Sequence, residues 1–125
     1  MIRAIDGLEV SREAGLTFRA WKQVRASDPY LCGHFPELTI YPGVFTLESV
    51  QQAVAGTVGA PVRIVLLRSA RFLAPLLESD VLTVAGTVTH GPDGCFEVDA
   101  RCTREDGELT ATVRARLSEV VPDAA

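Results

Sequence analysis

The sequence has little of several residue types and patterns on which common protein classes depend. Its 125 residues include only three cysteines and two histidines, and no two cysteines have the spacing of a zinc-binding CxxC pair. We therefore expect no metal site and interpret the cysteines as free, buried or half-buried thiols: Cys32, Cys95 and Cys102. No apolar run approaches the about 20 residues of a membrane-spanning helix, and the start MIRAIDGLEVSREAG lacks the pattern of a signal peptide. These absences predict a cytoplasmic protein with no membrane span.

Positive charge is also scarce. Twelve basic residues against 16 acidic ones give a net charge of −4, which lacks the basic footprint of a nucleic-acid-binding protein. The chain is 47% hydrophobic and 22% charged, which is typical of a globular protein and not of a disordered one. No repeat, low-complexity segment or linker divides it, so residues 1–125 are expected to form one domain.

Most of the chain has the pattern of short strands. Apolar residues alternate with polar ones, or form β-branched runs, in five segments that end at glycine- or proline-containing turns. These segments are residues 16–25, 62–72, 81–89, 96–102 and 109–117. The short turns between the later segments predict antiparallel pairing.

Only one segment has the spacing of a helix. Leu47, Val50, Val54 and Val58 recur at helical intervals, which predicts a helix from Thr46 to about Val58. An antiparallel sheet with a polar outer face needs something to cover its inner face, and this helix is the one candidate. The sequence therefore predicts an α+β fold in which a curved antiparallel sheet surrounds one central helix.

The stretch GHFPELTIYPGVFTLESVQQ, residues 33–52, places a histidine and a glutamate fourteen positions apart. Taken singly, each residue has an ordinary structural interpretation. His34 could be a structural loop histidine, Glu48 could complement the helix dipole, and Gln52 could form an i,i+4 pair with Glu48. His90, at a strand end, is interpreted as a surface residue.

Together, these residues resemble the 3-hydroxyacyl-acyl-carrier-protein dehydratases of fatty-acid synthesis, which belong to the hot-dog fold superfamily. That family has a G-H-F-P-G-x-P-x-x-P-G-V signature followed by a helix with E-x-x-x-Q. The matching positions here are Gly33, His34, Phe35, Pro36, Pro42, Gly43, Val44, Glu48 and Gln52. A weaker likeness continues through RSARFLAPLLESDVLTV. The chain departs from the family at Glu37 and Thr39, at Leu73-Ala74, and in an N-terminal segment where the family usually has a helix.

The resemblance implies a mechanism. His34 would remove the α proton of a 3-hydroxyacyl thioester, and Glu48, kept protonated by an apolar surround, would protonate the departing hydroxyl. The backbone N–H of Gly43, at the helix start, would stabilise charge on the thioester oxygen. The remaining positions implied to contact substrate are Tyr41, Val44, Gln52 and Phe72.

The resemblance also implies an assembly in which His34 of one subunit faces Glu48 of the other in a homodimer. It implies no metal or redox cofactor, because the acyl chain is carried on the phosphopantetheine of an acyl carrier protein. Such carriers are acidic, so a local basic patch is expected, with Arg63, Arg68 and Arg71 as candidates.

We therefore expect a dehydratase that converts (3R)-3-hydroxyacyl thioesters to trans-2-enoyl thioesters in fatty-acid or polyketide biosynthesis. Two alternatives stay open. One is a hot-dog thioesterase, which would hydrolyse the thioester. The other is a non-catalytic partner subunit of a heteromeric dehydratase.

Overall fold

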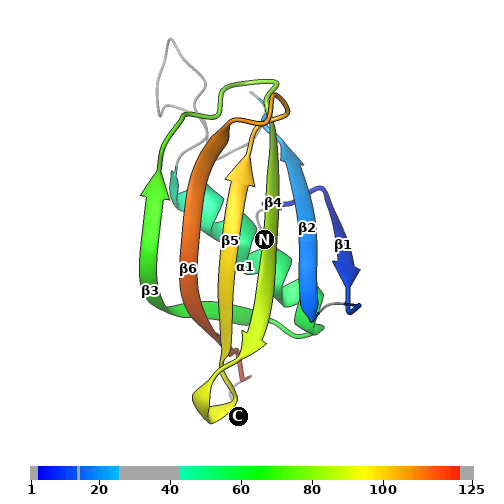
Figure 1. The fold of residues 1–125 in the computed structure, drawn as a ribbon, viewed down its shortest axis with the longest axis vertical. Helices are drawn as coiled ribbons and strands as arrows, with labels where there is room; N and C mark the ends of the chain where they lie inside the picture. The colour runs from blue at the N-terminus through cyan, green and yellow to red at the C-terminus, as the bar shows by residue number, and fades with distance from the viewer. Residues whose placement is uncertain (1–2, 14, 26–42, 122–125) are drawn as a thin grey trace.

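In the part of the chain that the structure describes, one helix and a six-stranded antiparallel sheet make up the fold. The structure, a computed structural model, describes residues 3–13, 15–25 and 43–121. Its elements are β1 (Gly7–Ser11), β2 (Leu16–Gln23), α1 (Gly43–Val58), β3 (Val62–Phe72), β4 (Val81–His90), the short 3-10 turn η2 (Pro92–Gly94), β5 (Phe96–Thr103) and β6 (Leu109–Glu119). The strand order is β1-β2-β4-β5-β6-β3, and α1 crosses the inner face of the curved sheet (Figure 1). The predicted α+β arrangement is confirmed.

Helix α1 is buried along a stripe of small and β-branched residues. The stripe consists of Thr46, Ser49, Val50, Ala53, Val54 and Thr57. The prediction was right for Val50 and Val54, but Leu47 and Val58 are only partly buried. Ser49 and Ala53 are fully buried, so small side chains occupy the centre of the helix–sheet contact while the larger Leu47 lies at its margin. Glu48 is the one charged residue of the helix.

The strands bury alternate residues, as the sequence predicts. In β5 and β6 the inner positions are Val98, Ala100, Cys102, Ala111, Val113, Ala115 and Leu117, all at most 3% exposed. Most of their neighbours in sequence carry charged or hydroxyl groups on the more exposed outer face, whereas Thr110 is buried and donates to the Cys102 carbonyl. Burial raises the pKa of the Cys102 thiol to about 12, which keeps it protonated, while Cys95 is partly buried.

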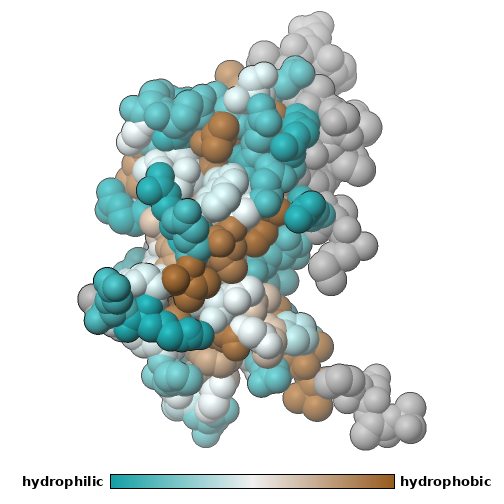
Figure 2. All heavy atoms as spheres, turned by 90° about the vertical axis from the view of Figure 1, so that its right-hand side faces the viewer, coloured by the Kyte–Doolittle hydropathy of each residue, from teal (hydrophilic) through white to brown (hydrophobic). Residues whose placement is uncertain are grey.

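Strand β1 was not predicted. Its five residues pair with β2 in the register Gly7↔Trp21 to Ser11↔Thr17 and form one edge of the sheet. Figure 2 looks at this edge, where small hydrophobic patches are separated by hydrophilic atoms. Strand β3 forms the opposite edge, and there Val65, Leu66 and Leu67 are 44–47% exposed in an unbroken apolar run.

The structure also describes His90, the grouping of possible metal ligands and the length of the helix. His90 is exposed and packs against the Phe96 ring at 5.5 Å between ring centroids, which agrees with a surface role. In the part of the chain that the structure describes, no three histidine, cysteine or acidic side chains are grouped as a metal site. Within that same part, no helix is long and apolar enough to cross a membrane.

Candidate active site

Glu48 lies on α1 with a glutamine amide on each of its carboxyl oxygens. Gln52 Nε2 donates a hydrogen bond to Oε1 at 3.1 Å, and Gln51 Nε2 donates one to Oε2 at 3.3 Å. Glu48 and both glutamines are partly buried. The i,i+4 contact between Glu48 and Gln52 is confirmed, and Gln51 adds an i,i+3 contact that the sequence analysis missed.

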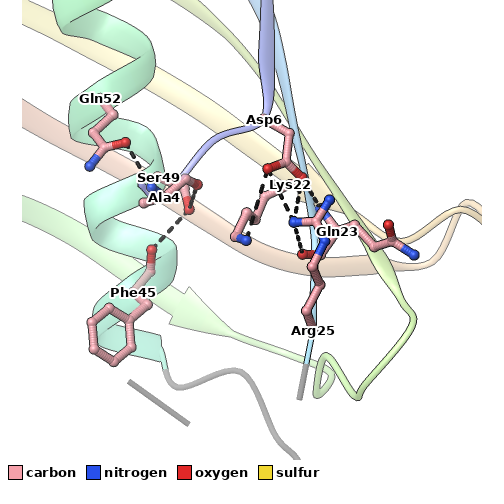
Figure 3. A network of polar contacts seen from close by, with 8 residues as sticks. All are labelled: Ala4, Asp6, Lys22, Gln23, Arg25, Phe45, Ser49 and Gln52. Carbon is pink, nitrogen blue, oxygen red and sulfur yellow. Dashed lines mark hydrogen bonds and ion pairs between the residues drawn. The ribbon is translucent and has the colours of Figure 1, made fainter. Parts of the chain in front are cut away.

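The Gln52 amide is oriented by the segment that precedes β1. The backbone N–H of Ala4 donates to Gln52 Oε1 at 2.8 Å, so the acceptor oxygen faces Ala4 and leaves Nε2 for Glu48. The Ser49 hydroxyl donates to the Ala4 carbonyl at 2.7 Å and also contacts the Phe45 carbonyl at 2.9 Å. As Figure 3 shows, Ala4 is thereby bound to α1 through both its N–H and its carbonyl.

The Gln51 amide is oriented in the same way by β3. The backbone N–H of Ile64 donates to Gln51 Oε1 at 2.8 Å, which directs Nε2 to Glu48. Ile64 stands next to a register shift in the pairing of β3 with β6, between Ile64 and Leu66. The two glutamines therefore connect one carboxyl group to segments at opposite ends of the sheet.

This surround differs from the apolar one that was expected for Glu48. Among the described residues, both carboxyl oxygens accept amide N–H groups, because Gln51 and Gln52 follow Glu48 at the spacings that share a helix face. A carboxyl group offers about four lone-pair sites, so two glutamines leave room for a proton and for a substrate hydroxyl. The two amides thus hold the carboxyl group from both of its oxygens.

Gly43 and Phe72 meet at the start of the helix. A Cβ added to Gly43 would lie 3.1–3.3 Å from three atoms of the Phe72 ring, so the ring sits directly over the Gly43 Cα. Phe72 is 51% exposed and neighbouring Val44 is 64% exposed. The backbone N–H groups of a first helical turn have no partner within the helix, so this end of α1 combines polar donors with an exposed apolar surface. The structure thus places four of the predicted positions, namely Gly43, Val44, Glu48 and Gln52, on α1, with the Phe72 ring against Gly43.

An ion cluster that the sequence analysis missed lies beside this region. Asp6 accepts hydrogen bonds from the Gln23 N–H at 2.7 Å and from Arg25 Nη1 at 3.2 Å, and Lys22 Nζ lies 4.0 Å away (Figure 3). Burial alone would raise the pKa of Asp6, but these hydrogen bonds and the two positive charges outweigh it and lower the pKa below its ordinary value. Lys22 is only 3% exposed. As the single lysine, at an inward position of an alternating strand, it was the signal that could have revealed the cluster.

The three predicted carrier-binding arginines lie on β3 and are exposed. Arg71 and Phe72 are opposite Thr112 and Ala111, so Phe72 shares the inner face with buried Ala111 and Arg71 faces outward. Arg68 is paired with Glu97 at 2.7 Å, and this contact lowers the pKa of Glu97. Arg63 and Arg71 are exposed.

Two predicted positions, His34 and Tyr41, lie outside the described residues, as does the rest of the GHFP motif. Their roles therefore stay predictions.

A curved antiparallel sheet wrapped around one long helix is the arrangement of the hot-dog fold. Solved structures agree with this class. The dehydratase heterocomplex ApeI:P from Xenorhabdus doucetiae superposes with a TM-score of 0.72 at 14% identity, over 89% of this chain and 95% of that one. A hypothetical thioesterase with coenzyme A from Streptococcus pneumoniae gives 0.63 at 17% identity, over 94% and 88%. At these identities the likeness establishes the fold, and the predicted hot-dog fold is confirmed.

Sequence comparison assigns the family. Residues 10–113 match the ApeI-like family, described as ApeI dehydratase. The 3-hydroxyacyl-[acyl-carrier-protein] dehydratase FabZ of Nitrosomonas europaea is 31% identical over an alignment of 122 residues. The alignment covers 85% of this chain and 79% of that protein. The chain belongs to the ApeI-like family of dehydratases, as a divergent relative of the FabZ enzymes.

Proposed function

We propose that the protein dehydrates (3R)-3-hydroxyacyl thioesters to trans-2-enoyl thioesters, with the acyl chain carried on the phosphopantetheine of an acyl carrier protein. The observation that carries the proposal is the partly buried Glu48 carboxyl group, the one titratable group of α1, which accepts an amide hydrogen bond on each oxygen. Family membership supports the reaction type, and the name of the FabZ relatives states an acyl-carrier-protein substrate.

In the proposed reaction His34 takes the α proton of the substrate, and the electron pair of that C–H bond forms the new double bond. The C–O bond at the β carbon breaks, and the departing hydroxyl takes a proton from Glu48, so one water molecule leaves. The backbone N–H of Gly43 donates to the thioester oxygen while negative charge develops there. The loss of water needs no external oxidant or reductant, so the proposal includes no redox cofactor.

The proposed contact with the acidic carrier uses exposed arginines of β3. Arg63 and Arg71 are the stronger candidates because Arg68 already pairs with Glu97. Rim charges of this kind chiefly increase the rate of association and are screened by salt.

We further propose that the catalytic protein is a dimer that forms along β3. An exposed edge strand with an apolar run is a site for association, and Val65, Leu66 and Leu67 form such a run on this edge. Through Gln51, Glu48 lies next to the same strand. A second copy docked there would bring its own residues close to Glu48, in line with a site shared between subunits.

The test is an assay of the purified protein with a 3-hydroxyacyl thioester on a carrier, following enoyl absorbance and released thiol separately. We expect the enoyl product and no thiol, whereas thiol release would indicate a thioesterase. His34→Ala and Glu48→Gln should each reduce turnover by about 10²–10⁴-fold with the fold intact. Losses below about tenfold would exclude these roles.

Mixed dimers test the shared site. If the two groups come from different subunits, co-expressed His34→Ala and Glu48→Gln chains form one intact site per mixed dimer and recover part of the activity. Confirmed mixed dimers without recovery would exclude the shared site. A wild-type chain that is inactive alone but active with a second, related chain would indicate a partner subunit. A panel of carrier-bound substrates would then separate fatty-acid from polyketide intermediates.

A further inference from the structure

Gln51 is a polar side chain that the proposed mechanism leaves without a role, although its amide contacts the same carboxyl group as Gln52. It is partly buried on α1, between Glu48 and strand β3. Its two polar atoms have different partners. Oε1 accepts the Ile64 N–H at 2.8 Å, and Nε2 donates to Glu48 Oε2 at 3.3 Å.

The direction of these hydrogen bonds follows from the backbone. The Ile64 N–H can only donate, so the Gln51 atom that faces it must be the carbonyl oxygen. The amide nitrogen then has to point away from β3, and the atom it meets is Glu48 Oε2. Strand β3 thus determines which end of the Gln51 amide reaches the carboxyl group.

A second donor changes how firmly a carboxyl group is held. The terminal torsion of a glutamate side chain is broad, so a single contact from Gln52 would leave the carboxyl plane free to turn about it. Gln51 and Gln52 grip different oxygens, at 3.3 and 3.1 Å, and so fix the plane. The two amides also connect the carboxyl group to different segments, Gln51 to β3 at Ile64 and Gln52 to Ala4 in the segment before β1.

From this arrangement we infer that Gln51 is a positioning residue, which fixes the plane of the Glu48 carboxyl group by connecting it to edge strand β3. The inference rests on the proposed role of Glu48 as the proton donor. Gln51 acts through Glu48 and touches no reacting atom, so its loss should lower kcat and leave KM nearly unchanged.

The test combines two substitutions at Gln51 with Glu48→Gln. Gln51→Met keeps the length of the side chain and removes both hydrogen bonds. Gln51→Glu keeps an oxygen for the Ile64 N–H and, when ionised, has no N–H for Glu48, so it keeps the support of β3 and replaces the contact with the carboxyl group by a like charge. Gln23→Met, the same change at an exposed position of β2, is the matched control and should leave kcat, KM and stability as in the wild type.

We expect Gln51→Met and Gln51→Glu to reduce kcat by about ten- to a hundredfold, with KM within about twofold, because small misplacements of a reacting group cost this much. In the Glu48→Gln background neither change should reduce kcat further, since the group that Gln51 orients is already missing. Urea unfolding monitors the fold, and if Gln51→Met does not fold, Gln51→Glu decides the outcome.

Two results would overturn the inference while the proposed function stands. One is a folded Gln51 variant with wild-type kcat when Glu48→Gln alone is severely impaired. The other is an equal further loss in the Glu48→Gln background, which would show that Gln51 only supports the fold. If Glu48→Gln itself keeps its turnover, the proposed function fails first, and the inference fails with it.

Discussion

The buried hydroxyl of Ser49 gives the sharpest stability prediction. Ser49 and Ala4 are both fully buried, and the hydroxyl donates to the Ala4 carbonyl at 2.7 Å. Ser49→Ala would leave this carbonyl without that donor, at a cost of about 1–3 kcal/mol for a buried acceptor. Alanine has a higher helix propensity, by roughly 0.5 kcal/mol, which offsets part of the loss. We therefore expect unfolding free energy to fall by about 0.5–2.5 kcal/mol.

Urea unfolding measures the effect, and a second buried hydroxyl on the same helix supplies the control. Thr57 donates to the Ala53 carbonyl at 2.7 Å, within α1, where a backbone N–H also serves that carbonyl. Thr57→Val should therefore cost less than Ser49→Ala. Equal losses for the two variants would mean that the contact with Ala4 contributes nothing. Because Ala4 also orients Gln52, Ser49→Ala should lower kcat as well, whereas Thr57→Val should not.

Two further predictions concern other parts of the fold. Gly86→Ala would place a Cβ 2.7 Å from the Phe18 ring and 2.9 Å from the Asp99 carbonyl, so we expect a loss of about 1–3 kcal/mol in urea unfolding. Gly56→Ala, whose Cβ would meet only the end of one flexible leucine side chain, is the control, and equal effects would refute the steric argument. The folded-state pKa of Asp6 is lowered, so its contribution to stability is present above its ordinary pKa of 3.8 and is lost as the pH falls through the lowered value. The difference in unfolding free energy between the wild type and Asp6→Asn should therefore shrink below about pH 4, and a difference that is constant or grows on acidification would contradict it.

The spacing of apolar residues in the sequence predicted the helix and the strands that bury one face and expose the other. Strand β6 alternates in sequence from Leu109 to Leu117, and the structure buries the predicted inner residues from Ala111 on. At its start the alternation fails, because Leu109 is only partly buried and Thr110 is buried next to a register shift with β5. Strand β1 escaped prediction because it lies at an edge and pairs only with β2, so only Gly7 and Leu8 are partly buried and no alternation marks it. The position of β1 in the sheet depends on its pairing with β2, and sequence pattern alone does not specify that pairing.

The candidate site divides in the same way. The Glu48–Gln52 contact was predictable because it is local, four residues apart on one helix. The contacts that orient the two glutamines were not predictable, because they join residues that are distant in sequence. Gln52 contacts Ala4, 48 positions away, and Gln51 contacts Ile64, 13 positions away on strand β3. Such contacts depend on how the helix packs against the sheet, which a local sequence pattern does not specify.

The position of the carboxyl group therefore depends on the whole sheet. Gln52 connects Glu48 to the segment that leads into β1, at one edge, and Gln51 connects it to β3, at the other. Any change in the curvature of the sheet moves these two attachment points relative to each other and so turns the carboxyl plane. Since β3 is also the edge that we propose for dimer formation, docking of a second copy there would stabilise the strand from which Gln51 takes its orientation. A dimer built in this way would contribute to the site in two ways. It would supply the residues that face Glu48, and it would hold the Glu48 carboxyl group in the plane that proton transfer requires.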